Sequence, residues 1–137
     1  MIIDSSALLA ILLGEPDQHR YAAAIAGATT RQMSVASYLE VALKVDRIAK
    51  AGGDPILDIS LERLGIALVP MTIAHGKVAR EAFNTFGYDH PARLNFGDCI
   101  VYALAKTSAE PLLFKGNDFR QTDLMSAMAE TGESPNG

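Results

Sequence analysis

The chain has 137 residues, of which 49% are hydrophobic and 20% charged, and this composition predicts one packed domain while excluding a disordered chain. Its net charge of −4 argues against non-specific coating of nucleic acid by the whole surface. Charge or glycine interrupts every apolar run before the roughly 18 residues that span a membrane, and the start lacks the basic residues of a signal peptide. These two features predict a soluble cytoplasmic protein. The single cysteine, Cys99, cannot form an intrachain disulfide, which is compatible with a reducing compartment.

Strands and helices alternate along the predicted chain. The helix starts carry capping residues: Ser5 or Ser6 before the first helix, Thr72 before the fifth and Asn95 before the sixth. In chain order we predict a strand at 1–3, helices at 7–13 and 18–25, a strand at 31–35, helices at 36–51 and 55–64, a strand at 66–69, helices at 73–86 and 96–107, a strand at 111–114, and a turn at 116–118 into a short helix.

This alternation predicts an α/β fold with a mainly parallel sheet covered by helices on both faces. We expect a single domain over residues 1–129, and a flexible C-terminal tail over 130–137 because that segment is rich in glycine, serine and proline. In parallel α/β sheets, ligands bind outside the carboxyl ends of the strands. That edge is therefore where a functional site is expected.

Four acidic residues lie against apolar runs, where a core would favour a hydrophobic side chain: Asp4, Glu40, Asp98 and Asp118. Asp4 follows the first predicted strand, and Asp118 follows the last after a short turn. Carboxylates gathered at one edge repel one another unless a cation or protons neutralise them. Without histidine or thiol beside them, they suit a hard cation such as Mg2+ or Mn2+.

Each acid also has a structural explanation. Asp4 could cap a helix, and Asp98 could favour the positive end of the helix that begins after Asn95. Glu40 could form a capping box with Ser37 or an ion pair with Lys44, and Asp118 could be a turn residue. A functional interpretation therefore rests on the set of four and not on any single residue.

The other chemically active residues favour no competing site. The three histidines (His19, His75 and His90) lack the spacing of a zinc pair, and Cys99 has no histidine near it in sequence. Three basic residues lie close in sequence to the acids: Arg93, Lys115 and Arg120. Ordinary solvated charge and a rim that holds a nucleic-acid backbone both fit them.

Four segments together resemble the PIN-domain ribonucleases, in particular the VapC-type toxins of bacterial toxin–antitoxin pairs. They are MIIDSSALLAIL, SYLEVALKV, HPARLNFGDCIVYALAK and PLLFKGNDFRQTDL, and they span nearly the whole chain. The resemblance implies a three-layer α/β/α sandwich. It also implies a Mg2+- or Mn2+-dependent endoribonuclease in which Asp4, Glu40 and Asp98 bind the metal.

In that family, an acid in the segment matching 116–119 completes the site, and many members carry an aspartate where this chain has Gly116. Here the fourth carboxylate would be Asp118, helped by Asn117, with Asp123 as a remoter candidate. Ser6 matches a hydroxyl position that touches the metal or its water.

The resemblance further implies an RNA substrate, held at the rim by Arg93, Lys115 and Arg120. It implies a homodimer and a small antitoxin whose C-terminal segment lies across the helices at 36–48 and 55–64. Three alternatives stay open. A haloacid-dehalogenase-like phosphatase would use Asp4 as nucleophile but needs an aspartate at Ser6. A receiver-like Mg2+-binding module needs a phosphoacceptor where Pro70 and Met71 follow Val69. The third is a PIN fold that only binds a partner.

Overall fold

The computed structural model describes residues 1–50 and 52–128. Its strands form one parallel four-stranded sheet in the order β3-β2-β1-β4. The strands are β1 (Ile2–Ile3), β2 (Gln32–Ser34), β3 (Ala67–Val69) and β4 (Leu112–Leu113). Each lies within a predicted strand, so the α/β class with a parallel sheet is confirmed.

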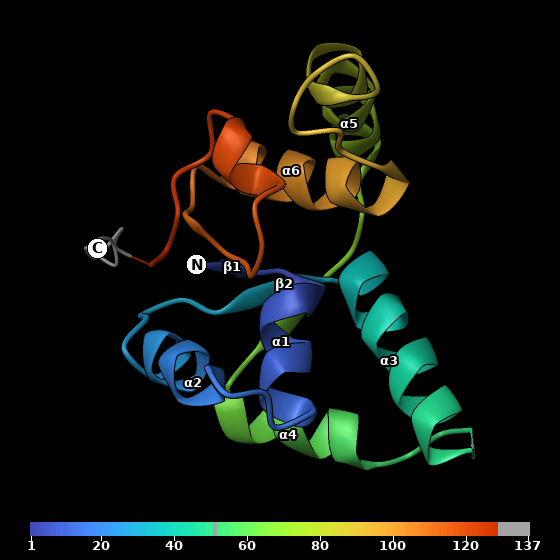
Figure 1. Cartoon of the computed structure of the whole chain (residues 1–137), viewed down its shortest axis with the longest axis vertical. Helices are drawn as coiled ribbons and strands as arrows, with labels where there is room; N and C mark the ends of the chain where they lie inside the picture. The colour runs from blue at the N-terminus through green and yellow to red at the C-terminus, as the bar shows by residue number, and fades with distance from the viewer. Residues whose placement is uncertain (51, 129–137) are drawn as a thin grey trace.

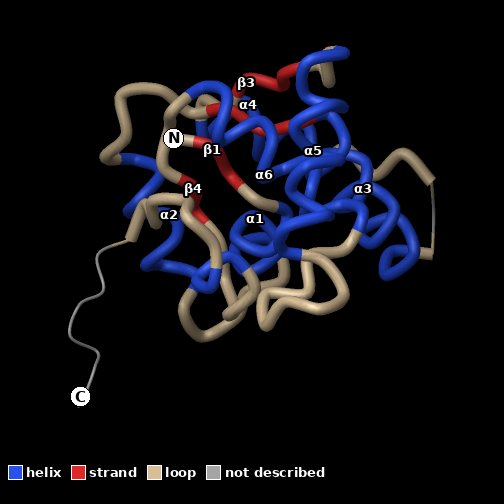
Figure 2. The backbone as a smooth tube through the Cα atoms, turned by 90° about the horizontal axis from the view of Figure 1, so that it is seen from above, coloured by secondary structure: helices blue, strands red, loops and turns tan. Residues whose placement is uncertain are grey.

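Helices cover both faces of the sheet, which confirms the three-layer arrangement. In Figure 1, α5 and α6 lie on one side of the strands and α1 to α4 on the other, and Figure 2 shows the helices around the strands from a second direction. Their bounds are α1 (Ser5–Leu12), α2 (Gln18–Ala26), α3 (Val35–Ala49), α4 (Ile56–Leu64), α5 (Ile73–Phe86) and α6 (Phe96–Ser108), and a 3-10 turn (Phe119–Gln121) follows β4.

Two hydrophobic cores fill the space between the layers, one on each face of the sheet. Because side chains alternate along a strand, Ile2 packs with α5 and α6 whereas Ile3 packs with the helices of the opposite layer. In β4, Leu112 and Leu113 divide in the same way. All four are fully buried. β1 and β4 thus read as continuous apolar sequence, as expected of strands covered on both faces.

Several predicted helix signals are confirmed. Thr72 and Asn95 cap α5 and α6, and Gly65 closes α4 with a φ of +67°. For α1, the prediction of Ser5 or Ser6 as the cap is wrong. The alternative interpretation of Asp4 as a helix cap is confirmed, because Asp4 fills that position and accepts a hydrogen bond from the Ser6 N–H. α3 ends at Ala49 with Lys50 as its C-cap, two residues before the predicted end at 51. The predicted tail at 130–137 lies outside the described residues.

Within the part of the chain that the structure describes, no helix is long and apolar enough to cross a membrane.

Candidate functional site

The four predicted acids come from four different elements. Asp4 directly follows β1, Glu40 lies in the second turn of α3, Asp98 in the first turn of α6, and Asp118 after β4. Since β1 and β4 are neighbours in a parallel sheet, Asp4 and Asp118 lie at the same edge. The fold therefore brings this edge together with the starts of two helices.

The carboxylates are close enough to act on one another. Burial raises the pKa of Asp4, and the charge of Asp118 raises it further. Partial burial of the Glu40 carboxylate, with smaller contributions from Asp4 and Asp98, raises its pKa, although the residue as a whole is exposed. Burial also raises the pKa of Asp98 to about 6, with added repulsion from Asp4 and Asp118. The four positions thus form one electrostatic cluster, which we call the carboxylate cluster.

Asp4 is held in place by its own helix start. It is only 6% exposed, and its Oδ2 accepts hydrogen bonds from the Ser6 N–H at 3.1 Å and the Ser6 hydroxyl at 2.5 Å. The same Ser6 oxygen accepts a hydrogen bond from the Lys115 N–H at 2.9 Å. Ser6 therefore orients Asp4 and also ties the segment after β4 to the segment after β1.

Asp98 is likewise fixed by a cap. Its Oδ2 accepts from the Asn95 N–H at 3.1 Å, and its own N–H donates to Asn95 Oδ1 at 2.9 Å, which closes a reciprocal capping box. The structural and functional interpretations of Asp4 and Asp98 are thus compatible. Asp4 caps α1, Asp98 completes the capping box of Asn95, and both still belong to the cluster.

Glu40 reaches the cluster across Gly97, the residue before Asp98. A methyl group built at Gly97 would lie 2.8 Å from Glu40 Oε2 and 3.3 Å from its Cδ, so alanine at this position would force the Glu40 carboxylate to shift. The capping box expected between Ser37 and Glu40 is wrong, because Ser34 caps α3. Sequence reasoning missed Gly97. Its only signal was a glycine in the first turn of a helix, where glycine is unfavourable.

Asp118 and Asn117 are exposed in the turn before Phe119. The carbonyl of Asn117 accepts from the Arg120 N–H, while Asp118 acts on Asp4 and Asp98 through its charge. Gly116 has a φ of +106°, a conformation that strains residues with a side chain. An aspartate at 116 is therefore incompatible with this turn as it stands.

Asp123 is engaged elsewhere. Its carboxylate accepts from the Tyr102 hydroxyl and the Lys106 ammonium, each at 2.7 Å, and Lys106 lowers its pKa. These partners lie further along α6 than Asp98, by one and two turns. The structure therefore assigns Asp123 to the anchoring of the segment after the 3-10 turn.

The three basic candidates differ in their surroundings. Lys115 is ion-paired with Glu15 at 2.6 Å and Asp17 at 3.0 Å, so its charge is already matched. Arg93 and Arg120 are exposed and form no ion pair within residues 1–50 and 52–128. Contact of these side chains with RNA stays a prediction.

The cluster is not closed around a common centre. Among the residues that the structure describes, no three histidine, cysteine or acidic side chains lie close enough together to enclose an ion. Asp4 and Asp98 are fixed by their caps, whereas Glu40 and Asp118 are exposed. Closure would therefore require movement of the two exposed carboxylates.

Comparison with known protein families identifies the family of this chain. The model of the PIN domain matches residues 1–124. The chain belongs to the PIN-domain family. Its sheet order also differs from the 2-1-3-4-5 order of receiver-like folds. The phosphatase and receiver interpretations of the chain are therefore excluded.

Curated relatives place this PIN domain among the VapC proteins, as the sequence motifs predicted. It is 48% identical over 126 residues to Ribonuclease VapC30 of Mycobacterium tuberculosis, which covers 90% of this chain and 95% of that protein. It is equally similar to Ribonuclease VapC of Mycolicibacterium smegmatis, with 90% and 97% covered. Ribonuclease VapC28 of M. tuberculosis is 44% identical, with 93% and 98% covered.

Solved structures agree with the PIN fold. The crystal structure of VapC20 from M. tuberculosis, titled a sarcin–ricin loop cleaving toxin, matches with a TM-score of 0.70 at 15% identity and covers 90% of this PIN domain and 95% of that chain. A toxin–antitoxin complex from Klebsiella pneumoniae matches with a TM-score of 0.68 at 14% identity and covers 89% and 92%. At these identities the likeness shows the fold alone.

Proposed function

We propose that this PIN domain is the ribonuclease toxin of a toxin–antitoxin pair, and that it hydrolyses RNA phosphodiester bonds with Mg2+ or Mn2+ held by Asp4, Glu40, Asp98 and Asp118. The observation that supports the proposal is the convergence of four acids from different elements, where burial and, to a smaller extent, mutual repulsion raise the pKa of three of them. Relatives named ribonuclease VapC, at 48% identity, support RNA as the substrate.

The donor set fits a hard divalent cation. The candidate ligands are carboxylate oxygens, with the Ser6 hydroxyl and the Asn117 amide oxygen nearby in the chain, and all of these suit Mg2+ or Mn2+. When bound, such an ion activates water for attack and offsets charge on the phosphate. A positive charge in the cluster would also offset the burial and the repulsion that raise these pKa values.

The side chains of the proposed site have different roles. The caps fix Asp4 and Asp98, so they provide a rigid base for the ion. Glu40 and Asp118 are exposed and turn inward to complete the ligand set. Asp118, at the tip of its turn, is then placed to orient the attacking water. Arg93 and Arg120 hold the RNA backbone, while Lys115 must first release Glu15 and Asp17.

An exposed apolar surface on α3 and α4 is the proposed contact for a protein partner. Exposed apolar side chains lie along α3 and α4, namely Leu39, Leu43, Ile48, Ile56 and Ile59. We propose that the C-terminal segment of a small antitoxin covers this surface and that the toxin forms a homodimer. Light scattering of the pure protein that showed only monomer across micromolar concentrations would contradict the dimer.

Cleavage of an RNA hairpin tests the proposal. Purified protein should cut the hairpin with Mg2+ or Mn2+, and EDTA should abolish cutting. Asp98→Asn should lower the rate by at least about 100-fold while circular dichroism stays unchanged. Glu62→Gln changes an exposed helical acid outside the cluster and should retain the full rate.

The outcomes separate three cases. Equal cutting by the wild type and by Asp98→Asn would indicate a contaminating nuclease and sink the assignment. Metal binding without cutting would favour a PIN domain that only binds a partner. Loss of both metal binding and cutting in Asp98→Asn, with Glu62→Gln unaffected, is the result we expect.

A further inference from the structure

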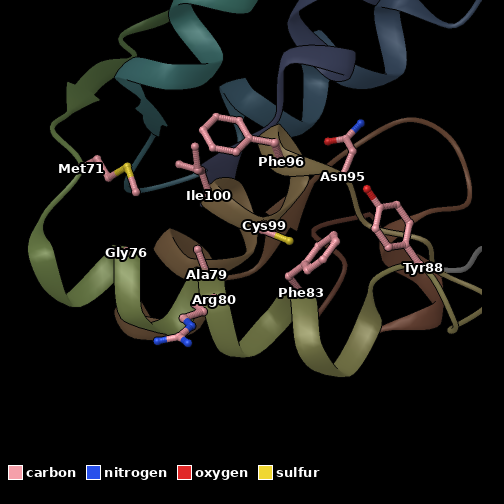
Figure 3. Close-up of a pocket in the computed structure, with 10 residues that line it drawn as sticks. All are labelled: Met71, Gly76, Ala79, Arg80, Phe83, Tyr88, Asn95, Phe96, Cys99 and Ile100. Carbon is pink, nitrogen blue, oxygen red and sulfur yellow. The ribbon is translucent and has the colours of Figure 1, made fainter.

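A cavity of about 490 Å3 lies between α5 and α6, outside the carboxylate cluster. Its walls include Met71, Ala79, Phe83, Tyr88, Phe96 and Cys99. Figure 3 shows Phe83 of α5 and Cys99 of α6 between the two helices, with Met71 towards one end and Tyr88 towards the other. A volume of this size is typical of a small-molecule site, and the lining is mainly apolar and aromatic.

The cavity and the carboxylate cluster share the first turn of α6. Asn95 lines the cavity and exchanges two hydrogen bonds with Asp98. Phe96 stands between them in the chain, also lines the cavity, and is 83% exposed. The cavity and the carboxylate cluster therefore adjoin the same turn of α6.

The walls suit a flat aromatic ligand. Phe83 and Tyr88 pack edge to face, with ring centres 5.0 Å apart and an interplanar angle of 81°. Phe96 adds an exposed ring at the start of α6. RNA-binding proteins commonly hold unpaired bases on such rings, and one stacked base typically contributes a factor of roughly 10 to 100 to binding.

Polar groups at the cavity have spare hydrogen-bonding capacity. The Asn95 oxygen accepts from the Asp98 N–H, but its amide NH2 donates to none of the described residues. The Tyr88 hydroxyl also forms no hydrogen bond within that part of the chain, and the Arg80 guanidinium forms no ion pair there. The amide and hydroxyl suit the edge of a base, and Arg80 suits a backbone phosphate.

We propose that this cavity is a nucleobase subsite, which takes one unpaired base of the RNA strand that is cut at the carboxylate cluster. The proposal rests on the proposed function. Under an apolar protein segment, the polar groups of Asn95, Tyr88 and Arg80 would lose water without gaining partners, which is costly. A nucleotide provides both an aromatic face and polar partners for them.

A series of hairpins with single abasic sites tests the subsite. After the cut is mapped on the hairpin, each nucleotide flanking it is replaced in turn by an abasic one. With the wild type, one abasic position should lower kcat/KM by roughly 10- to 100-fold. Phe96→Ala should lose a similar factor on the intact hairpin and nothing further at that abasic position, because the two changes remove the same contact. Phe96→Tyr should restore both.

Ile73→Ala is the matched control. Ile73 is 82% exposed, almost as exposed as Phe96, and it lies outside the cavity lining. It should keep the wild-type rate and the wild-type abasic profile. Thermal unfolding of each variant confirms that the fold is intact.

Two results would overturn the subsite. In one, Phe96→Ala loses the same factor on every hairpin of the series. In the other, Phe96→Ala shifts the sedimentation coefficient but leaves the abasic profile unchanged, which would make this face a protein contact. If the wild type binds RNA without cutting it, the proposed function fails separately, and fluorescence anisotropy on the same series decides the subsite by the same position-specific loss. Absence of any RNA binding would overturn both.

Discussion

The carboxylate of Glu40 lies against Gly97, at a position where a methyl group would come within 2.8 Å of Oε2. The Glu40 carboxylate therefore occupies this position next to the start of α6 because residue 97 has no side chain to displace it. This contact joins α3 and α6, which are far apart in the sequence, and substitution of Gly97 tests its role.

Gly97→Ala should separate metal binding from stability. Alanine favours a helix over glycine by about 1 kcal/mol, so the free energy of unfolding should hold or rise slightly. The new methyl group displaces Glu40, and metal affinity should fall about tenfold. Isothermal titration with Mn2+ and urea unfolding measure the two effects. Gly76→Ala, in α5 with its nearest neighbour at 3.8 Å, is the control and should leave the affinity unchanged. Unchanged affinity in Gly97→Ala would contradict the role of this contact.

The free energy of unfolding should depend on pH through Asp98. Its pKa rises from an ordinary 3.8 to about 6 in the fold, so the folded state binds the proton more tightly than the unfolded state. The proton therefore stabilises the fold at low pH, and this contribution is lost as the pH rises from about 4 through 6. Because Asp98 is only half-buried, we expect Asp98→Asn to stabilise the metal-free protein by about 1 kcal/mol at pH 7.5 and by little at pH 4. Urea unfolding at both pH values measures this difference.

The same titration affects metal binding. An ion binds the charged carboxylate, so Mn2+ affinity should fall as the pH drops from 7 through 6, where the proton competes for Asp98. Titrations at a series of pH values measure the fall. An affinity that stayed constant between pH 7 and 5 would show that Asp98 is not a ligand.

Moving the carboxylate from position 118 to position 116 tests whether Asp118 is the fourth ligand. Asp118→Asn should lower metal affinity by roughly 10- to 100-fold if Asp118 belongs to the ligand set. Adding Gly116→Asp to that variant restores a carboxylate at the position that is acidic in many family members. It should not restore affinity, because residue 116 has a φ of +106°. Rescue by the double variant would show that the turn adapts and that 116 is the better ligand position.

Ser6 should contribute to stability as well as to the site. Ser6→Ala removes the hydroxyl donor to Asp4 and the acceptor for the Lys115 N–H, and the cost should be about 1–3 kcal/mol in urea unfolding. Ser60→Ala serves as the control, since the Ser60 hydroxyl forms no hydrogen bond among the described residues and lies within α4. Equal stability of the two variants would contradict the link through Ser6.

Local sequence signals predicted the elements well. Helix ends depend on interactions within a few residues of the sequence. Short-range hydrogen bonds form the caps at Thr72 and Asn95, and the backbone conformation of Gly65 ends α4. The acids after β1 and β4 could be expected at one edge because parallel strands place their carboxyl ends together. The predicted cap of α1, Ser5 or Ser6, lies only one or two residues from the observed cap, Asp4.

Contacts between distant segments could not be read from local patterns. Three such contacts depend on the tertiary fold. They are the space that Gly97 leaves for Glu40, the pairing of Lys115 with Glu15 and Asp17, and the bonds from Tyr102 and Lys106 to Asp123. The cavity between α5 and α6 arises in the same way. From charge and spacing alone, Lys115 and Asp123 would be expected to be unpaired surface residues. In the structure each of them forms an ion pair.

The division of β1 between the two cores has a consequence for how the protein loses activity. Ile2 belongs to one core, Ile3 to the other, and Asp4 follows immediately. If either helical layer came away, one of these isoleucines would lose its packing, and the first carboxylate of the cluster would lose its anchor. We therefore expect no partly unfolded form that still cuts RNA, so that residual activity during denaturation reports the fraction of fully native molecules.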